Sequence, residues 1–371
     1  MINKYLTRFS ADMCRYKAKK TKKWSYSNSK KILFITENTK ICNSQVYPFY
    51  LYKKEISRSL GSIEFREINI DRLEQYYKMN EMGGADIIFF QPWFDKGHEL
   101  IIMLLTQIRA ANPKAIIIFL DSYSPLDLRL ANVVSPLIDR YIKKHVFIDR
   151  KNYSESTYGD TNLVEYYNNL YGLPQEDIVK FNIPDDFLGK LVVGPGFFTC
   201  SKMLPALSVN LSTLTYSKKI NVHARLAQSG TGWYQKMREH ALLACQQFKV
   251  GSIVTSDFVS YSTYMKELRS SRICFSPFGY GEACWRDYEA IMSGALLIKP
   301  DMSHIESDPN IFIPFETYIP VAWDFSDLAE KVNYYLEHED ERKRITRVAY
   351  DVLYNYDRDK EFVKQLSTLV M

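Results

Sequence analysis

The chain has 371 residues, 48 Lys and Arg against 43 Asp and Glu, a formal net charge of +5, and 46% hydrophobic residues. This is the composition of an ordinary globular protein, which excludes disorder over the whole chain. No apolar run approaches the roughly 20 residues that span a bilayer, and no signal peptide is recognisable. The six cysteines are scattered without a C-x-x-C pair. Zinc and redox motifs are therefore excluded, and a cytoplasmic location is expected.

The positive charge is concentrated at the start of the chain. Residues 1–30 hold nine basic side chains and one acid, Asp12, so this segment carries +8 and the other 341 residues sum to −3. A nucleic-acid binder is disfavoured, because its charge should spread over a face of the fold. Helical spacing relates the apolar residues Ile2, Tyr5, Leu6, Phe9, Met13 and Tyr16. Two interpretations are open: an amphipathic arm on an anionic membrane surface, or an apolar stripe packed on the body.

The next part of the chain alternates apolar runs with longer periodic segments. Strands are predicted at 30–36, 63–70, 85–91, 114–120 and 141–148, with helices near 45–60, 71–80, 97–111 and 125–138. Such alternation predicts a parallel sheet with helices on both faces. Residues 151–190 are interpreted as helix and loop elaboration, and 194–217 as a connection between domains.

The alternation then begins again. Strands are predicted at 218–226, 249–255, 272–278 and 295–300, with helices at 234–248, 263–271, 286–293, 327–336 and 339–354. The expected organisation is a basic arm (1–30), an N-terminal Rossmann-like domain (31–205) and a C-terminal Rossmann-like domain (206–371). The fold class is α/β, with two doubly wound domains facing a central cleft. Ligands of such sheets bind beyond the carboxyl ends of the strands.

The most informative segment is 271–301, where a predicted strand leads through a loop containing Gly279 and Gly281 into a helix near Trp285. The helix N-terminus offers free N–H groups and a positive dipole end. Arg286 adds a full positive charge there, so a phosphate or diphosphate nearby is expected. The alternative is a salt bridge from Arg286 to Asp287 or Glu282.

Glu289 follows Arg286 by three residues and so shares its helix face. A carboxylate in this position can accept hydrogen bonds from the two hydroxyls of a ribose, as an acidic residue does in Rossmann-type sites. The alternative is a solvent-facing glutamate on an ordinary helix. Gly294 and the apolar strand after it favour a helix inside the sheet domain, and with it the ribose role.

The pattern formed by Arg286, Glu289, Ala290, Gly294 and the strand 295–298 resembles the donor site of GT-B glycosyltransferases of the group-1 type, which includes spore-coat-related and exostosin-like enzymes. The likeness covers roughly residues 218–355. It implies that an Arg after the first strand of the C-terminal domain, here Arg225, binds the donor diphosphate. Where relatives add a Lys, this chain offers Lys236 or Arg238. Many relatives separate two glutamates by seven residues, whereas six separate Glu282 and Glu289 here.

The resemblance therefore implies a donor site made by seven residues: Arg225, Gly279, Tyr280, Gly281, Glu282, Arg286 and Glu289. Tyr280 or Trp285 is a candidate for stacking on a base or sugar, with packing as the alternative. On the acceptor side, Asp121 and His98 follow predicted strands and are the candidate catalytic bases of an inverting enzyme. Asp121 could equally cap a turn, and His98 could simply begin a helix.

No D-x-D at a strand end and no H-E-x-x-H is present, so no metal site and no cofactor are expected. The predicted protein is a metal-independent hexosyl- or pentosyltransferase. It would move a sugar from a UDP- or GDP-linked donor to a hydroxyl of a glycan or glycolipid in the cytoplasm, with peripheral attachment to a membrane as an open alternative. A GT-B-like nucleotide-sugar epimerase and a non-catalytic glycan-binding scaffold are the alternatives.

Overall fold

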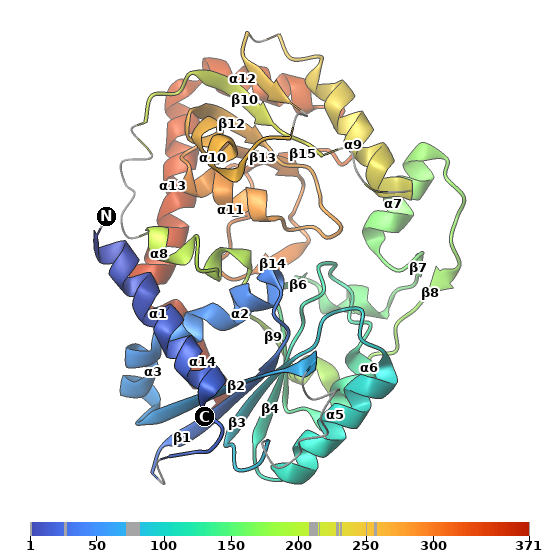
Figure 1. The fold of residues 1–371 in the computed structure, drawn as a ribbon. Coiled ribbons are helices and arrows are strands. Elements are labelled where there is room, and N and C mark those ends of the chain that lie inside the picture. Colours follow the sequence, from blue (N-terminus) through green and yellow to red (C-terminus); the bar gives the residue numbers. More distant parts are fainter. Residues whose placement is uncertain are drawn as a thin grey trace.

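The computed structural model has two halves, one above the other in Figure 1, each built around a parallel sheet. It describes residues 2–25, 28–71, 82–207, 214, 216–227, 230, 232–249, 251–255 and 258–370, without the side chains of 2–5. The helix expected near 71–80 falls almost wholly outside these residues.

The N-terminal sheet has six strands in the order β2-β1-β3-β4-β5-β9, and every neighbouring pair is parallel. The inner strands β1, β3 and β4 are mostly apolar because helices cover both faces of the sheet, whereas the edge strand β2 includes Glu64, Arg66 and Glu67. The strands are Lys30–Thr36 (β1), Ile63–Asn69 (β2), Ile87–Gln91 (β3), Ile116–Leu120 (β4), Arg140–Lys143 (β5) and Leu191–Val193 (β9). The helices are Ile2–Lys20 (α1), Lys40–Leu51 (α2), Lys53–Leu60 (α3), His98–Ala111 (α5), Ala131–Val134 (α6) and Asn162–Tyr171 (α7).

The C-terminal sheet has five strands in the order β11-β10-β12-β13-β15, again all parallel. Its strands are Ile220–Ala224 (β10), Ile253–Thr255 (β11), Ser271–Phe275 (β12), Leu296–Pro300 (β13) and Ile319–Val321 (β15). The helices are Leu204–Leu207 (α8), Gly232–Cys245 (α9), Tyr261–Arg269 (α10), Trp285–Met292 (α11), Leu328–Glu337 (α12), Glu339–Arg358 (α13) and Glu361–Val370 (α14). The predicted fold class, two Rossmann-like halves, is confirmed.

Two elements join the halves. The last helix, α14, returns to the N-terminal half beside α3 (Figure 1), where the Phe362 ring meets Phe49 at 4.9 Å between centroids. Strand β6 (His145–Phe147) pairs antiparallel with β14 (Ile305–Ser307) of the C-terminal half. The single strand predicted at 141–148 is therefore wrong: β5 stays in the sheet, and β6 leaves it to bind the other half.

Three further elements differ from those predicted. The helix expected at 125–138 is reduced to α6 and a 3-10 turn, Ser135–Leu137, because Pro125 and Pro136 interrupt it. The sixth strand, β9, has only three residues and lies between the predicted elaboration (151–190) and the predicted connection (194–217), so the sequence did not predict it. The helix α14 was missed although its buried residues, Phe362, Val363, Leu366 and Val370, have helical spacing.

The predicted N-terminal helix is present as α1, but it presents a different face from the one expected. Small residues pack it on the body, with Ala11 and Ala18 buried, and Arg15 binds Glu67 of β2 at 2.7 Å. The large apolar side chains point away: Leu6 is 60%, Phe9 65%, Met13 39% and Tyr16 57% exposed. For these four residues, the interpretation of a stripe packed on the body is wrong.

Candidate donor site

The loop after β12 is tied to the start of α11 by one buried carboxylate. Asp287 accepts hydrogen bonds from Ser276 Oγ at 2.6 Å and from the Cys284 amide at 2.7 Å, and it pairs with buried Lys299 at 3.2 Å. The hydrogen bond from the Cys284 amide caps the N-terminus of α11, and the contacts with Ser276 and Lys299 fix this helix against the sheet. Because Asp287 is fully engaged inside the domain, it forms no ion pair with Arg286.

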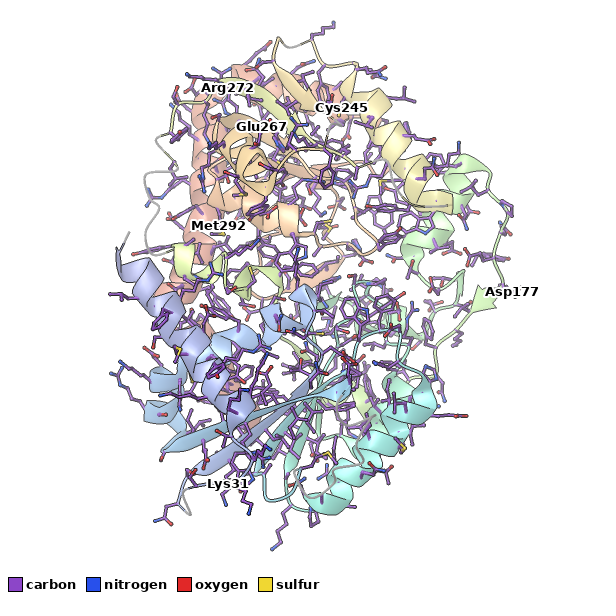
Figure 2. All side chains as sticks on the ribbon, viewed as in Figure 1. Lys31, Asp177, Cys245, Glu267, Arg272 and Met292 are labelled. Atoms are coloured by element: carbon purple, nitrogen blue, oxygen red, sulfur yellow. The ribbon has the colours of Figure 1, made fainter. Side chains whose placement is uncertain are left out.

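Three arginines meet around a cavity of about 610 Å³ beyond this edge of the sheet, which we call the arginine cavity. Arg286 donates to the Arg225 carbonyl at 2.9 Å, and Arg238 of α9 donates to the Phe278 carbonyl at 2.6 Å. Arg225 is held by both oxygens of Glu267 of α10, at 2.6 and 2.8 Å. Figure 2 labels Glu267 in the upper, C-terminal half.

The positive charge of this cavity is only partly balanced. Within the described residues, no carboxylate lies within ion-pair distance of Arg286 or Arg238, and the buried Nε atom of each has no hydrogen-bond partner. Burial lowers the pKa of Arg238, and the neighbouring charge of Arg286 lowers it further. Uncompensated, crowded guanidinium groups favour an anionic ligand such as a diphosphate.

Glu289 lies at the border of the arginine cavity. It is largely buried, and Oε1 accepts a hydrogen bond from the Tyr261 hydroxyl at 3.1 Å. Burial raises the pKa of this carboxyl. Aromatic residues of the segment after β11 form the adjoining wall: Tyr261, Tyr264 and Phe258, whose side chain is 100% exposed. A ring open to solvent beside cationic groups is suited to stacking on a planar base.

The glycine loop brings the two halves into contact. A Cβ at Gly281 would lie 2.4 Å from the Ser124 carbonyl oxygen, so only glycine fits this approach. The Gly279 amide donates to the Gly281 carbonyl at 3.0 Å. Tyr280 is exposed and stacks on Tyr234 of α9, with centroids 4.2 Å apart. The loop thus approaches the N-terminal half but does not line the arginine cavity.

Glu282 faces the other half of the molecule. It is fully buried, and Oε2 lies 3.2 Å from Nε2 of His145 on β6. Glu282 Oε1 and His145 Nδ1 are buried without hydrogen-bond partners. Burial lowers the pKa of His145, against the raising effect of Glu282. The pair joins the N-terminal half to the C-terminal half. Because Glu282 faces His145, the salt bridge from Glu282 to Arg286, one of the alternatives given by the sequence, does not form.

A second cavity of about 420 Å³, here the α1 cavity, adjoins the first and shares Tyr261, Trp285 and Glu289 with it. Its other walls come from α1, α2 and the segment before α8: Asp12, Arg15, Lys40, Asn43, Tyr47, Cys200, Ser201, Lys202 and Met203. Glu289 and Trp285 therefore stand between a space in the C-terminal half and a space between the halves.

Neither candidate base lines these two cavities. Asp121 is buried, and Oδ2 binds Lys143 Nζ at 2.6 Å and the Tyr141 hydroxyl at 2.8 Å. Burial alone would raise the pKa of Asp121, but Lys143 and Lys144 outweigh it and hold that pKa below its usual range. His98 is exposed at the first turn of α5.

The structure thus brings Arg225, Arg286 and Glu289 together around the arginine cavity and separates them from Asp121 and His98. Of the two substitutes for the missing Lys, Arg238 lines the arginine cavity, whereas Lys236 pairs with Glu239 outside it. Phe258 and His145 were missed. No local pattern marks either residue, because each is placed by a strand end and a contact from another part of the chain.

Neither a metal-binding cluster nor a membrane-spanning helix is found in the part of the chain that the structure describes. No group of three or more His, Cys, Asp or Glu side chains there could hold a metal ion. None of the helices described is both long and apolar enough to cross a membrane.

Residues 211–363 match the family described as "Glycosyl transferase-like". A search of curated proteins returns no match. Among solved structures, an alpha-glucosyltransferase in complex with UDP-glucose and DNA containing an abasic site has a TM-score of 0.51 and 10% identity, over 92% of this chain and 99% of that one. A glycosyltransferase from Rickettsia africae ESF-5 has a TM-score of 0.50 and 10% identity, over 93% and 98%.

TarM is also similar, with a TM-score of 0.45 and 10% identity over 76% of this chain; the chain spans 54% of TarM. Three observations indicate the same class of protein: the family match, the helix that carries Arg286 and Glu289, and the two facing sheet domains. Residues 211–363 thus resemble a glycosyltransferase domain of the group-1 type, and the whole chain has the GT-B fold. The predicted resemblance to a glycosyltransferase is confirmed, whereas the transfer of a hexosyl or pentosyl group stays a prediction.

Proposed function

We propose that this glycosyltransferase binds a nucleoside diphosphate sugar in the arginine cavity and transfers the sugar to a hydroxyl group presented from the α1 cavity. The observation that carries this proposal is the meeting of Arg225, Arg238 and Arg286 at the N-terminus of α11, two of them without a carboxylate partner among the described residues. The acceptor we propose is a glycan or glycolipid.

Each part of the donor has a group suited to it. The diphosphate would be held by the arginines and the amide groups at the start of α11. Glu289 would accept hydrogen bonds from the ribose hydroxyls in place of the bond from Tyr261. Phe258 would stack on the base. These assignments place the sugar towards Trp285 and the boundary of the α1 cavity, where an acceptor can reach it.

Charge stabilisation of the leaving diphosphate needs cations, and here the protein itself supplies three. Preorganised positive groups at the leaving group stabilise the charge that develops in the transition state. We therefore propose that transfer proceeds without a divalent metal. Rates that stay unchanged with EDTA would support this, and a rate restored only by Mg²⁺ or Mn²⁺ would contradict it.

The proton acceptor of an inverting reaction would have to reach the α1 cavity. Asp12 and Glu289 are the carboxylates that line it, so Asp12 joins Asp121 and His98 as a candidate base. The Asp12→Asn variant tests it. A loss of kcat with unchanged donor affinity is expected for a base, whereas unchanged kcat would remove Asp12 from consideration.

We also propose that α1 binds an anionic membrane surface. A reducing compartment would suit the six cysteines, all of them described, which form no disulfide. The exposed stripe of Leu6, Phe9, Met13 and Tyr16 lies among the lysines of α1, and Asp12 and Arg15 of the same helix line the α1 cavity. An apolar stripe flanked by lysines inserts into anionic headgroups. Membrane binding would hold the α1 cavity close to a lipid-linked acceptor.

Vesicle sedimentation tests the membrane contact. The Phe9→Ser/Met13→Ser variant should lose binding to phosphatidylcholine vesicles containing phosphatidylglycerol. The Leu243→Ser variant, which removes an exposed leucine of α9, is the matched control. Equal sedimentation of the double variant and the wild type would refute the contact.

Calorimetry with UDP, GDP and their sugars tests the donor site, and NMR of the donor after incubation follows its fate. Tight binding of one nucleoside diphosphate, lost in Arg286→Ala, supports the proposal. An isomerised sugar without transfer would indicate the epimerase. Absence of any nucleotide binding would favour the scaffold, as would equal affinity in wild type and in Arg286→Ala/Glu289→Ala.

A further inference from the structure

A cavity of about 530 Å³ lies at the opposite edge of the C-terminal sheet from the donor site; we call it the basic cavity. Lys218 precedes β10, Arg272 is the second residue of β12, and Gly294 precedes β13, so the cavity lies at the amino ends of these strands. Three strand residues, Ile273–Phe275, separate Arg272 from the start of the donor loop at Ser276, a rise of about 13 Å along the strand. The two sites are therefore distinct. Figure 2 shows Arg272 in the upper half, away from the N-terminal half.

The residues around this cavity carry five positive charges and one negative charge. The cations come from the segment before β10, from β12 and from the first half of α13, and the remaining residues supply a small apolar and aromatic wall. The lining is Leu214, Tyr216, Lys218, Arg272, Gly294, Glu339, Arg342, Lys343, Thr346 and Arg347.

The innermost cations are bound mainly by neutral groups. Lys218 Nζ donates to two carbonyl oxygens, at 2.8 and 2.9 Å. Arg342, only 5% exposed, donates to the Tyr335 carbonyl at 2.7 Å. Arg272 donates to the side-chain oxygen of Asn221. All three thus donate to neutral oxygens, and their charges are hardly compensated.

The one acid in the lining is already engaged. Glu339 Oε1 pairs with Lys343 at 2.6 Å, and its other oxygen is 3.9 Å from Arg342. Burial and the charge of Arg342 lower the pKa of Lys218 to about 8. Burial also lowers the pKa of Arg342; Glu339 opposes this shift, and Arg272 adds to it. The three inner cations thus repel one another, and an anion would relieve that repulsion.

We propose that the basic cavity binds a phosphate monoester of sugar-phosphate size. Guanidinium groups match the oxygens of a phosphate in pairs, and the cavity has the volume of an ordinary small-molecule site. Tyr216, 55% exposed, and Leu214 offer a wall for the ring of the sugar. A concave site with buried cations at its base favours a small ligand over an extended polyanion, which would follow a flat surface.

Calorimetry and thermal shift on the full chain test this site with inorganic phosphate, glucose 6-phosphate and glucose. The Arg286→Ala variant is used throughout, so that phosphate binding in the arginine cavity does not contribute. Glucose 6-phosphate should bind, inorganic phosphate more weakly, and glucose not at all. In Arg272→Gln/Lys343→Gln, the Kd for glucose 6-phosphate should rise at least about tenfold, because two charge-assisted contacts are lost.

The control is Arg358→Gln, which neutralises an exposed arginine at the far end of α13 that pairs with Asp359; its affinity should equal that of the parent. The ligand-free Arg272→Gln protein should melt no lower than the parent, because one of three repelling charges is removed. Three outcomes would overturn the proposal: no binding of either phosphate, equal binding of glucose and glucose 6-phosphate, or an unchanged Kd in the double variant.

Discussion

The carboxyl ends of the two parallel sheets carry charged residues of similar kinds, yet they treat those charges in opposite ways. Beyond β4 and β5, Asp121 is enclosed by Lys143, Tyr141 and the Tyr123 amide, so its charge is compensated inside the protein. Beyond β10 and β12, Arg286 and Arg238 have no described carboxylate partner and border a cavity. A charged residue after a strand therefore indicates a ligand only where the protein leaves its charge uncompensated.

The largest expected effect is on stability, from a substitution that removes the charge of buried Asp121. Asp121→Asn should lower the free energy of unfolding by about 3–5 kcal/mol, because Lys143 is left buried without its counter-charge. Donor affinity of the folded protein should not change. Urea unfolding and calorimetry measure the two quantities. Asp95→Asn, at an exposed site after β3, is the control and should stay within about 0.5 kcal/mol of the wild type. A stable Asp121→Asn protein without activity would instead make Asp121 catalytic.

In the arginine cavity, a substitution should lower activity and leave stability almost unchanged. Arg286→Ala is expected to lower kcat/KM about 10²–10³-fold, through loss of a positive group at the leaving diphosphate. Its melting temperature should change little, because Arg286 makes no ion pair in the described structure. Lys236→Ala, which removes an exposed cation of α9, should leave kcat/KM unchanged. An Arg286→Ala protein with a much lower melting temperature and unchanged donor affinity would show that the arginine is structural.

The aromatic wall sharpens the comparison within the open site. Phe258→Ala should weaken donor binding by about 1–3 kcal/mol, the range of base stacking on an aromatic ring. Free sugar phosphate without a base should bind the arginine cavity of both proteins equally. Calorimetry with the nucleoside diphosphate measures the difference, and Phe94→Ala, another exposed phenylalanine, is the control. Unchanged affinity in Phe258→Ala would remove this residue from the base site.

The smallest effect concerns pH. Burial lowers the pKa of Lys144 from 10.5 to about 7. Between these values the unfolded chain binds more protons than the folded one, so stability rises with pH from about 7 upward, by at most about 1.4 kcal/mol per pH unit. Lys144→Met should flatten this slope between pH 7 and 9, whereas exposed Lys364→Met should not. Equal slopes in wild type and Lys144→Met would show that Lys144 stays charged when buried.

Much of the donor side could be predicted locally. Strand, glycine loop, Arg286 and Glu289 follow one another within a single segment, so spacing along the chain already implies their neighbourhood. The family resemblance implies Arg225, which directly follows β10. By contrast, Arg238 contributes only because α9 packs beside β12, and Phe258 only because the segment after β11 returns to α11. Neither neighbourhood is recorded in local spacing.

The sequence by itself determined the alternation of strands and helices, the donor motif and the position of the basic segment, because these depend on periodicity and nearby residues. Only the tertiary structure decided which charges are compensated. Asp121 is enclosed because β5 lies beside β4, and Glu282 meets His145 because β6 leaves one sheet to pair with β14. It also decided which face of α1 is buried: Ala11 and Ala18 allow close packing on β2, which leaves the large apolar residues outside. Pairing across strands is set by sheet order, and no short-range pattern encodes that order.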